Sequence, residues 1–124
     1  MDKSEIESVI QTYFDASYES IGENMREVFH SVSHVYGHEE AGALRDMNRE
    51  AFIKVVEARR HDTPVPDHPK QNEIISIDFT SEKTAVARVK LRVGRIIFTD
   101  ILSFIYLDGK WTIIAKLFAG VPVE

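Results

Sequence analysis

TAVARVKLRVGRIIFTDILSFIYLDGKWTIIAKLF, residues 84–118, is the stretch that decides the fold. Apolar and polar side chains alternate along much of it, which predicts strands with one buried face. The predicted strands cover residues 84–93, 96–107 and 110–118. Two-residue turns separate them, at Gly94-Arg95 and Asp108-Gly109, and Asp-Gly is a favoured turn between antiparallel strands. With a further strand at 74–80, the sequence predicts four consecutive antiparallel strands.

Counting outward from the two turns assigns each residue to a face of the sheet, because side chains alternate along a strand. One face is apolar except for Asp100 and the polar tips of Tyr106 and Trp111. Its apolar members are Ala85, Ala87, Val89, Leu91, Val93, Ile96, Phe98, Leu102, Phe104, Ile113, Ala115 and Leu117. Helices are expected to cover this face, with Asp100 between Val89 and Leu117. A buried carboxylate must be paired, hydrogen-bonded, hydrated or protonated, so Asp100 is the anomaly of the sequence.

The opposite face combines an apolar band with basic residues at its edge. The band and its edge consist of Ile97, Ile101, Ile105, Ile114, Phe118, Arg88 and Lys90. An apolar patch of this kind on a small protein usually meets another surface. We therefore expect a homodimer that forms through this outer sheet face about a two-fold axis. A β-bulge at Asp108-Gly109 would shift the last strand by one residue and exchange its two faces.

The first half of the chain has the period of helices with one buried face. Apolar residues recur every three or four positions from Ser4, the expected N-cap, to about Ile21, and Gly22 is expected to end this helix. The other expected elements are a helix at 25–30 capped by Asn24, strands at 34–36 and 43–47, a helix at 49–60 capped by Asn48, and a proline-rich loop at 61–72. No composition shift divides the chain. The sequence therefore predicts one α+β domain over residues 1–124.

Composition narrows the class of protein. The 124 residues include 15 Lys and Arg against 20 Asp and Glu, so the net charge is −5 with neutral histidines. Because there is no basic excess for phosphate contacts, we expect no nucleic-acid partner. The absence of cysteine excludes disulfides, thiol nucleophiles and cysteine-ligated metals. No apolar run approaches the ~20 residues of a membrane span, and no signal peptide is evident, so we expect a cytoplasmic domain with no membrane partner.

Several segments resemble the nuclear transport factor 2-like superfamily, in particular its SnoaL-like members and the group described as "putative lumazine-binding". They are residues 10–15 (IQTYFD), 25–30 (MREVFH), 48–53 (NREAFI), 98–103 (FTDILS) and 108–116 (DGKWTIIAK). The resemblance covers nearly the whole chain. It implies a cone-shaped α+β fold in which three N-terminal helices pack on the concave face of a curved, mainly antiparallel sheet. Enzymes of the superfamily use an acid or base inside this bowl, and Asp100 is the one residue to which the resemblance carries that place.

Asp100 is the main candidate for chemistry inside the bowl. It can act as a general base or orient a ligand, or it can be a structural carboxylate that is paired with Tyr13, His30 or an arginine or is brought to the surface by strand curvature. Phe98 and Trp111 could stack on a planar ligand, although aromatic residues in a small domain are more often core. The candidate ligand contacts are therefore Tyr13, His30, Phe98, Asp100 and Trp111, and the candidate catalytic residue is Asp100.

His30, His34 and His38 recur every four residues, which on one helix would place their imidazoles on one face, as a metal site needs. The residues between them do not favour a helix, and a strand is expected to begin near His34. We therefore expect neither a metal ion nor a cofactor.

Three functions stay open at this stage. The first is a small-molecule-binding domain whose apolar internal pocket contains one carboxylate and takes a small apolar or planar ligand. The second is an isomerase or polyketide-cyclase-like enzyme that uses Asp100 to abstract a proton next to a carbonyl group. The third is a protein-interaction module with no ligand. An enclosed cavity would favour the first two, and a bowl filled by its own side chains would favour the third.

Overall fold

The structure is a computed structural model, and it describes residues 2–63 and 65–124. Three helices and six strands follow in the order α1 (Ser4–Glu19), α2 (Gly22–Val28), β1 (Phe29–His38), β2 (Leu44–Asn48), α3 (Arg49–Asp62), β3 (Asn72–Phe79), β4 (Thr84–Val93), β5 (Ile96–Leu107) and β6 (Lys110–Pro122). The strands form a single sheet in the order β2-β1-β6-β5-β4-β3. Among the strand pairs of the described residues, β1–β6 is parallel and the other four are antiparallel. The predicted α+β fold is thus confirmed.

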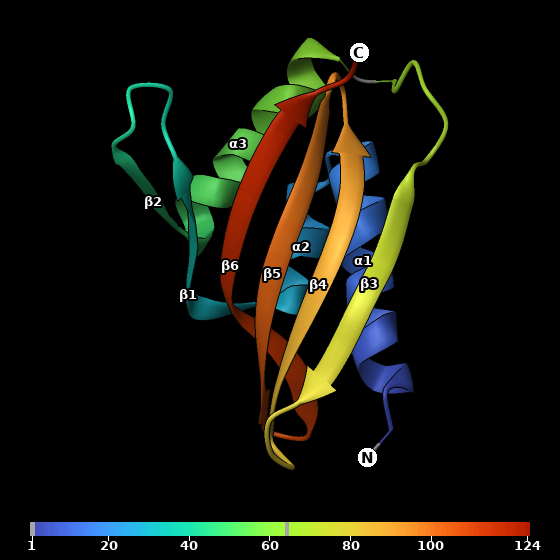
Figure 1. Ribbon diagram of the computed structural model, residues 1–124, viewed down its shortest axis with the longest axis vertical. Coiled ribbons are helices and arrows are strands. Elements are labelled where there is room, and N and C mark those ends of the chain that lie inside the picture. The colour runs from blue at the N-terminus through green and yellow to red at the C-terminus, as the bar shows by residue number, and fades with distance from the viewer. Residues whose placement is uncertain (1, 64) are drawn as a thin grey trace.

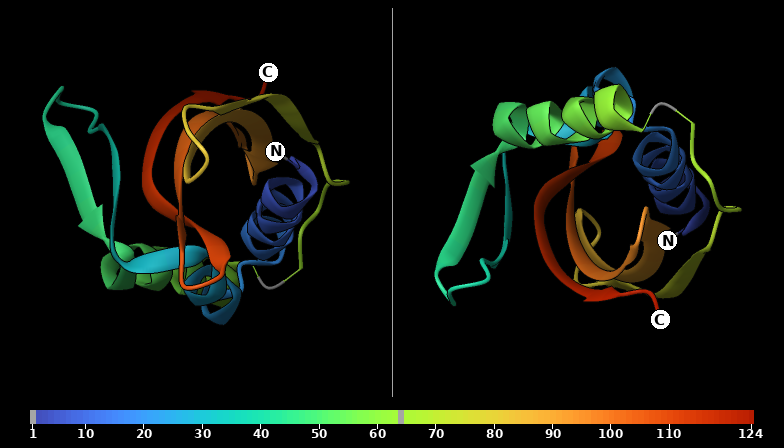
Figure 2. Two further views of the ribbon diagram at one scale, coloured as in Figure 1. Left: turned by 90° about the horizontal axis from the view of Figure 1, so that it is seen from below. Right: turned by 90° about the horizontal axis from the view of Figure 1, so that it is seen from above.

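The sheet is strongly curved, and the helices lie against its concave side (Figure 1). In the views along the strands, β3 to β6 curl around α1, while the β1–β2 hairpin projects to one side (Figure 2). The core fills the space between α1 and the sheet, and its largest fully buried side chains include Tyr13, Phe29 and Phe104. Among the residues described, no helix has the length and apolar composition needed to cross a membrane.

The boundaries of the first two helices differ from the prediction. The Asp2 carboxylate, rather than the Ser4 side chain, accepts a hydrogen bond at the start of α1, from the Ser4 N–H at 2.9 Å. Ser20, in the left-handed conformation with φ 57°, ends α1, and its N–H donates to the Ala16 carbonyl. Gly22 does not end α1 but begins α2. Only two residues, Ser20 and Ile21, therefore connect α1 to α2. The helix α2 ends at Val28, and β1 follows directly from Phe29.

Most of the remaining elements confirm the prediction. The Asn48 side chain caps α3 and accepts from the Ala51 N–H at 2.9 Å. The β4–β5 hairpin has the predicted register, with Val93 opposite Ile96 and Val89 opposite Asp100. At the next turn Asp108 and Gly109 both have positive φ, 51° and 81°, as a type I′ turn requires.

The predicted register of β6 is wrong beyond Ile113. Phe104 faces Ile113, but Ser103 faces Ala115, so Ile114 is an extra residue in β6. Such a bulge exchanges the two faces of everything that follows it. Lys116 and Phe118 consequently turn to the concave side, opposite Leu102 and Asp100. The displaced residues, Ala115 and Leu117, turn to the outer face, where Leu117 is 51% exposed.

The bulge also corrects the predicted dimer surface. Phe118 belongs to the interior, so it cannot contribute to an outer apolar band. Leu117 takes that place, paired with Ile101, and Val121 pairs with Ile97. The outer face thus keeps an apolar band, with Leu117 and Val121 in place of Phe118.

Candidate functional site

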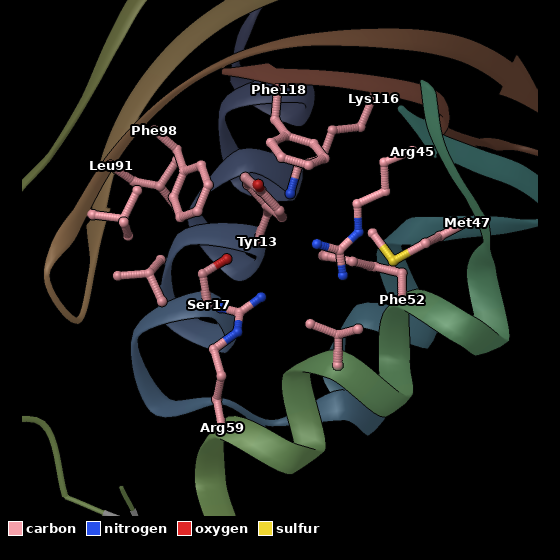
Figure 3. A pocket seen from close by; sticks show the side chains of 13 residues that line it. Tyr13, Ser17, Arg45, Met47, Phe52, Arg59, Leu91, Phe98, Lys116 and Phe118 are labelled. Carbon is pink, nitrogen blue, oxygen red and sulfur yellow. The ribbon is translucent and has the colours of Figure 1, made fainter. Parts of the chain in front are cut away.

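A cavity of about 260 Å³ opens between the concave face of the sheet and the helices (Figure 3). Every layer of the fold contributes to its wall. The lining residues are Tyr13 and Ser17 of α1, Arg45 and Met47 of β2, Phe52, Val55 and Arg59 of α3, Leu91 and Val93 of β4, Ile96 and Phe98 of β5, and Lys116 and Phe118 of β6. The volume lies near the lower end for ligand pockets, roughly 300–1,000 Å³.

Aromatic rings form much of the wall. Phe98 and Phe118 meet edge to face, with ring centroids 5.8 Å apart, and Phe52 lies on α3 across the cavity. Phe118 fits because Gly37 of β1 has no side chain: a Cβ there would come within 2.5 Å of the ring. Arg45, opposite Gly37 in the β1–β2 pair, turns to the same face and projects into the cavity.

Tyr13 and Asp100 form a hydrogen-bonded pair at the back of this wall. The Tyr13 hydroxyl donates to Oδ2 of Asp100, which is completely buried. Among the residues described, no hydrogen-bond partner reaches the other carboxylate oxygen, Oδ1. The pairing with Tyr13 that the sequence offered as a structural role for Asp100 is therefore confirmed.

Lys116 brings a buried cation to the same place. Its Nζ lies 3.9 Å from Oδ2 of Asp100, and its side chain is almost fully buried. Three aromatic rings surround the ammonium: the centroids of Phe52, Tyr13 and Phe118 lie at 4.4, 5.0 and 5.6 Å from Nζ. Such contacts stabilise a cation through the negative faces of the rings.

Burial perturbs the ionisation of these groups. It lowers the pKa of Lys116 to about 8, because the charged form loses its water; the nearby Asp100 charge opposes this effect and the Arg59 charge adds to it. Burial also raises the pKa of Tyr13 well above its usual value, and the neighbouring Asp100 carboxylate raises it further. Strong perturbation of this kind beside a cavity is typical of functional sites.

Two arginines complete the charge of the cavity. The guanidinium groups of Arg45 and Arg59 both point into it (Figure 3). Burial lowers the pKa of Arg59, but an arginine stays charged at any physiological pH. The described lining residues include three cationic side chains and no carboxylate. The cavity is therefore apolar and aromatic in its walls and positive in its charge.

The structure separates the predicted ligand contacts into two groups. Tyr13 and Phe98 line the cavity, and Asp100 lies directly behind Tyr13 and Lys116 without being part of the lining. His30, the second residue of β1, does not line the cavity, and its Nδ1 accepts from the Val32 N–H at 3.1 Å. Trp111 lies in another depression with Phe79 and Tyr106.

Three lining cations were missed by sequence reasoning. Regular alternation along β6 places Lys116 on the outer face, and the bulge at Ile114, which the sequence does not indicate, turns it inward. Arg45 lies on a short strand in which the order of apolar and polar residues does not indicate the face on which each side chain lies. Arg59 did carry a signal, because it falls on the same side of the α3 pattern as Phe52 and Val56. A charged residue on the apolar side of a helix is a candidate for a buried site.

The histidines that recur every four residues lie on the extended strand β1 rather than on a helix. His34 contacts Asp46 of β2, with Nδ1 2.6 Å from Oδ1. Within residues 2–63 and 65–124, no three potential metal-binding side chains gather at one point.

Solved structures with this fold are numerous, and several of them cover almost the whole chain. An NTF2-like protein of unknown function from Silicibacter pomeroyi DSS-3 superposes with a TM-score of 0.83 at 22% identity, over 98% of this chain and 100% of that one. One from Shewanella baltica OS155 gives a TM-score of 0.84 at 22% identity, over 96% and 93% of the chains. At these identities the likeness shows the fold alone.

A third solved structure, an NTF2-like protein of unknown function from Methylobacillus flagellatus KT, is 26% identical with a TM-score of 0.76, over 95% of this chain and 90% of that one. No curated protein matches the sequence. The model of a family described as "Putative lumazine-binding" matches residues 1–119. The chain therefore belongs to this family, and it shares the fold of the NTF2-like proteins.

Proposed function

We propose that the protein binds a small anionic molecule with a planar or apolar body in the cavity between α1, α3 and the concave sheet. The observation that carries the proposal is the lining itself: three cationic side chains project into a space walled by aromatic rings, and no described lining residue supplies a carboxylate to neutralise them. Family membership and the fold support a ligand-binding domain in general.

The two arginines are the natural partners of the ligand's negative group. A guanidinium offers several N–H donors in a plane and binds a carboxylate with two parallel hydrogen bonds. Hydrogen bonds to a charged group contribute about 1.5–3 kcal/mol each, more than neutral ones. The rings of Phe52, Phe98 and Phe118 would then contact the body of the ligand.

Asp100 takes an indirect role in this proposal. Because it lies behind the wall, it acts on Tyr13 and Lys116, which do line the cavity. The Tyr13 hydroxyl donates its proton to Asp100, so its oxygen is free to accept a hydrogen bond from a ligand. In this proposal the two arginines, rather than Asp100, make the main polar contacts with the ligand.

The geometry favours binding over proton abstraction by Asp100. A general base must come within hydrogen-bond reach of the proton that it removes. Asp100 is completely buried, and Tyr13 occupies its Oδ2. The open cavity also favours a ligand over a pure interaction module, because a bowl without a ligand would be expected to be filled by its own side chains.

Isothermal titration with 2-naphthoate and 2-naphthamide tests the proposal, since the two probes differ in charge but hardly in shape. Binding of naphthoate, with weaker or no binding of naphthamide, is expected. Arg59→Gln should weaken naphthoate binding at least about tenfold, the loss of one charge-assisted contact. Arg88→Gln, the same change on the exposed outer face, should leave it unchanged. The proposal fails if neither probe binds, or if Arg59→Gln and Arg88→Gln behave alike.

We further propose that the protein is a homodimer through the outer sheet face. The apolar band of Ile97, Ile101, Leu117 and Val121, with Arg88 and Lys90 along its edge, supports this arrangement. The positive charges at the edge would restrict the relative orientations in which two copies can associate.

A further inference from the structure

We infer that Lys116 is an amine nucleophile that forms an imine with a carbonyl group of the bound molecule, so that the ligand class is an oxo acid. This inference rests on the proposed function, because the arginines must hold the acid group while the amine meets the carbonyl carbon. The imine is a covalent bond, which reversible binding of the ligand would not require.

The position of the amine is the first argument. Lys116 is the one lysine among the described lining residues, and its Nζ points into the cavity beside Tyr13 (Figure 3). Its nearest charged partner is Oδ2 of Asp100 at 3.9 Å, beyond hydrogen-bond distance, and that oxygen already accepts from Tyr13. Within residues 2–63 and 65–124, no hydrogen bond holds the amine. Its nitrogen is therefore free to approach a ligand.

The availability of the neutral amine is the second argument, because only an unprotonated nitrogen has a lone pair to attack with. Desolvation in an apolar pocket beside another cation is the usual way in which proteins activate a lysine. Here burial and the Arg59 charge lower the pKa to about 8. About a tenth of the amine is then neutral at pH 7, against well under a thousandth for an ordinary lysine.

The groups that surround Lys116 can transfer the protons that imine formation requires. The nitrogen lone pair forms a bond to the carbonyl carbon, the C=O π bond breaks, and the oxygen takes up a proton to give a carbinolamine. Loss of water from this species leaves the C=N bond, and the amine protons go to the departing oxygen. Tyr13 and Asp100 lie beside the nitrogen and can relay these protons. No oxidant or reductant takes part.

The second recognition element fixes the ligand class. Arg45 and Arg59 stay charged when Lys116 is neutral, so the site keeps its affinity for an anion during the reaction. A ligand with a carboxylate toward these two guanidiniums and a ketone or aldehyde toward Lys116 would satisfy both. A simple aldehyde would lack the first contact, and a simple carboxylate the second.

Reductive trapping tests the inference. The protein is incubated at pH 7 with 4-carboxybenzaldehyde and cyanoborohydride, which reduces an imine to a stable secondary amine. Intact mass and peptide mapping should show one carboxybenzyl group per chain, on Lys116. Labelling of Lys116 should be at least about tenfold faster than that of Lys54, an exposed lysine of α3 outside the proposed dimer face, because burial lowers the pKa of Lys116.

Matched variants separate the nucleophile from mere proximity. Lys116→Arg should abolish the adduct, and Lys116→Met should do the same if the arginine disturbs the fold. Lys54→Arg, the same change on the exposed side of α3, should leave it unchanged. Benzaldehyde, which lacks the acid group, should label Lys116 more slowly. Uniform labelling of surface lysines, or equal labelling of Lys116→Arg, would overturn the inference.

Titration with 4-carboxybenzyl alcohol, which cannot form an imine, distinguishes failure of the covalent step from failure of the proposed function. If this alcohol binds and no adduct forms on Lys116, the covalent step is wrong while the proposed function stands. If the alcohol, 2-naphthoate and the aldehyde all fail to bind or react, the proposed function is wrong as well.

Discussion

Asp100 and Lys116 are two charges that the fold removes from water together. Their separation of 3.9 Å, with Tyr13 donating to the same carboxylate oxygen, makes each dependent on the other. A buried ion pair need not stabilise a fold more than apolar residues would, but the removal of one partner leaves the other charge uncompensated, at a cost of about 3–5 kcal/mol.

A double-mutant cycle should therefore show strong coupling. Asp100→Asn and Lys116→Met are each expected to lower the free energy of unfolding by about 3–5 kcal/mol, and the double variant by clearly less than the sum. Urea unfolding of the four proteins measures these values. Additive losses would mean that the two charges are solvated separately.

The pH dependence of stability follows from the pKa of Lys116. In the folded protein this pKa is about 8, whereas in the unfolded chain it is the usual value of about 10.4. Between these pH values the unfolded chain holds a proton that the folded protein has lost, so the free energy of unfolding rises with pH. This contribution is complete above the unfolded pKa and is lost as pH falls through 8.

Relative to Lys116→Met, the wild-type protein should gain stability from pH 8 to 10, by at most about 1.4 kcal/mol per pH unit. Above pH 10 the raised pKa of Tyr13 lowers the stability of both proteins, because the unfolded tyrosine loses a proton that the folded one keeps, and this effect cancels in the comparison. Urea unfolding at several pH values, with both proteins in one buffer series, measures the difference. Parallel profiles would show that Lys116 titrates as an exposed lysine.

At the scale of elements, β6 shows which features of a strand can be predicted from the sequence and which cannot. The β4–β5 register and the Asp108-Gly109 turn followed from alternation and turn chemistry, and both are confirmed. The bulge at Ile114 did not follow, because Ile113 and Ile114 are both apolar and either can face the core. The Asp100–Tyr13 pair was therefore predictable from β5 and α1, whereas the inward direction of Lys116 was decided by packing.

Gly37 offers a test of how β1 and β6 shape the cavity. A methyl group there would meet the Phe118 ring at 2.5 Å, so the ring would have to swing toward the cavity. Gly37→Ala should lower the free energy of unfolding by about 1–3 kcal/mol, as overpacking does, and weaken naphthoate binding. The second change Phe118→Leu should restore much of the stability. Thermal unfolding and calorimetry measure both effects, and unchanged stability and binding in Gly37→Ala would contradict this account of the wall.

At the scale of the whole molecule, the curvature of the sheet gives its two faces different roles. The concave face is covered by helices and holds the cavity, while no helix of residues 2–63 and 65–124 lies on the convex face (Figure 2). Ile101, Leu117 and Val121 on this face are 40%, 51% and 59% exposed. Because they lie on adjacent strands in paired positions, they form one patch rather than scattered contacts.

This patch predicts a dimer at micromolar concentration, which light scattering coupled to size-exclusion chromatography measures. A two-fold interface uses each residue twice, so one substitution introduces two charges into it. Leu117→Glu should therefore give a monomer, since a desolvated carboxylate costs several kcal/mol. Leu44→Glu changes the same residue type at a more exposed position on β2, outside the patch, and should leave the dimer intact. A wild-type protein that is monomeric at this concentration would refute the dimer, and Leu44→Glu monomers beside Leu117→Glu dimers would move the interface to the β1–β2 hairpin.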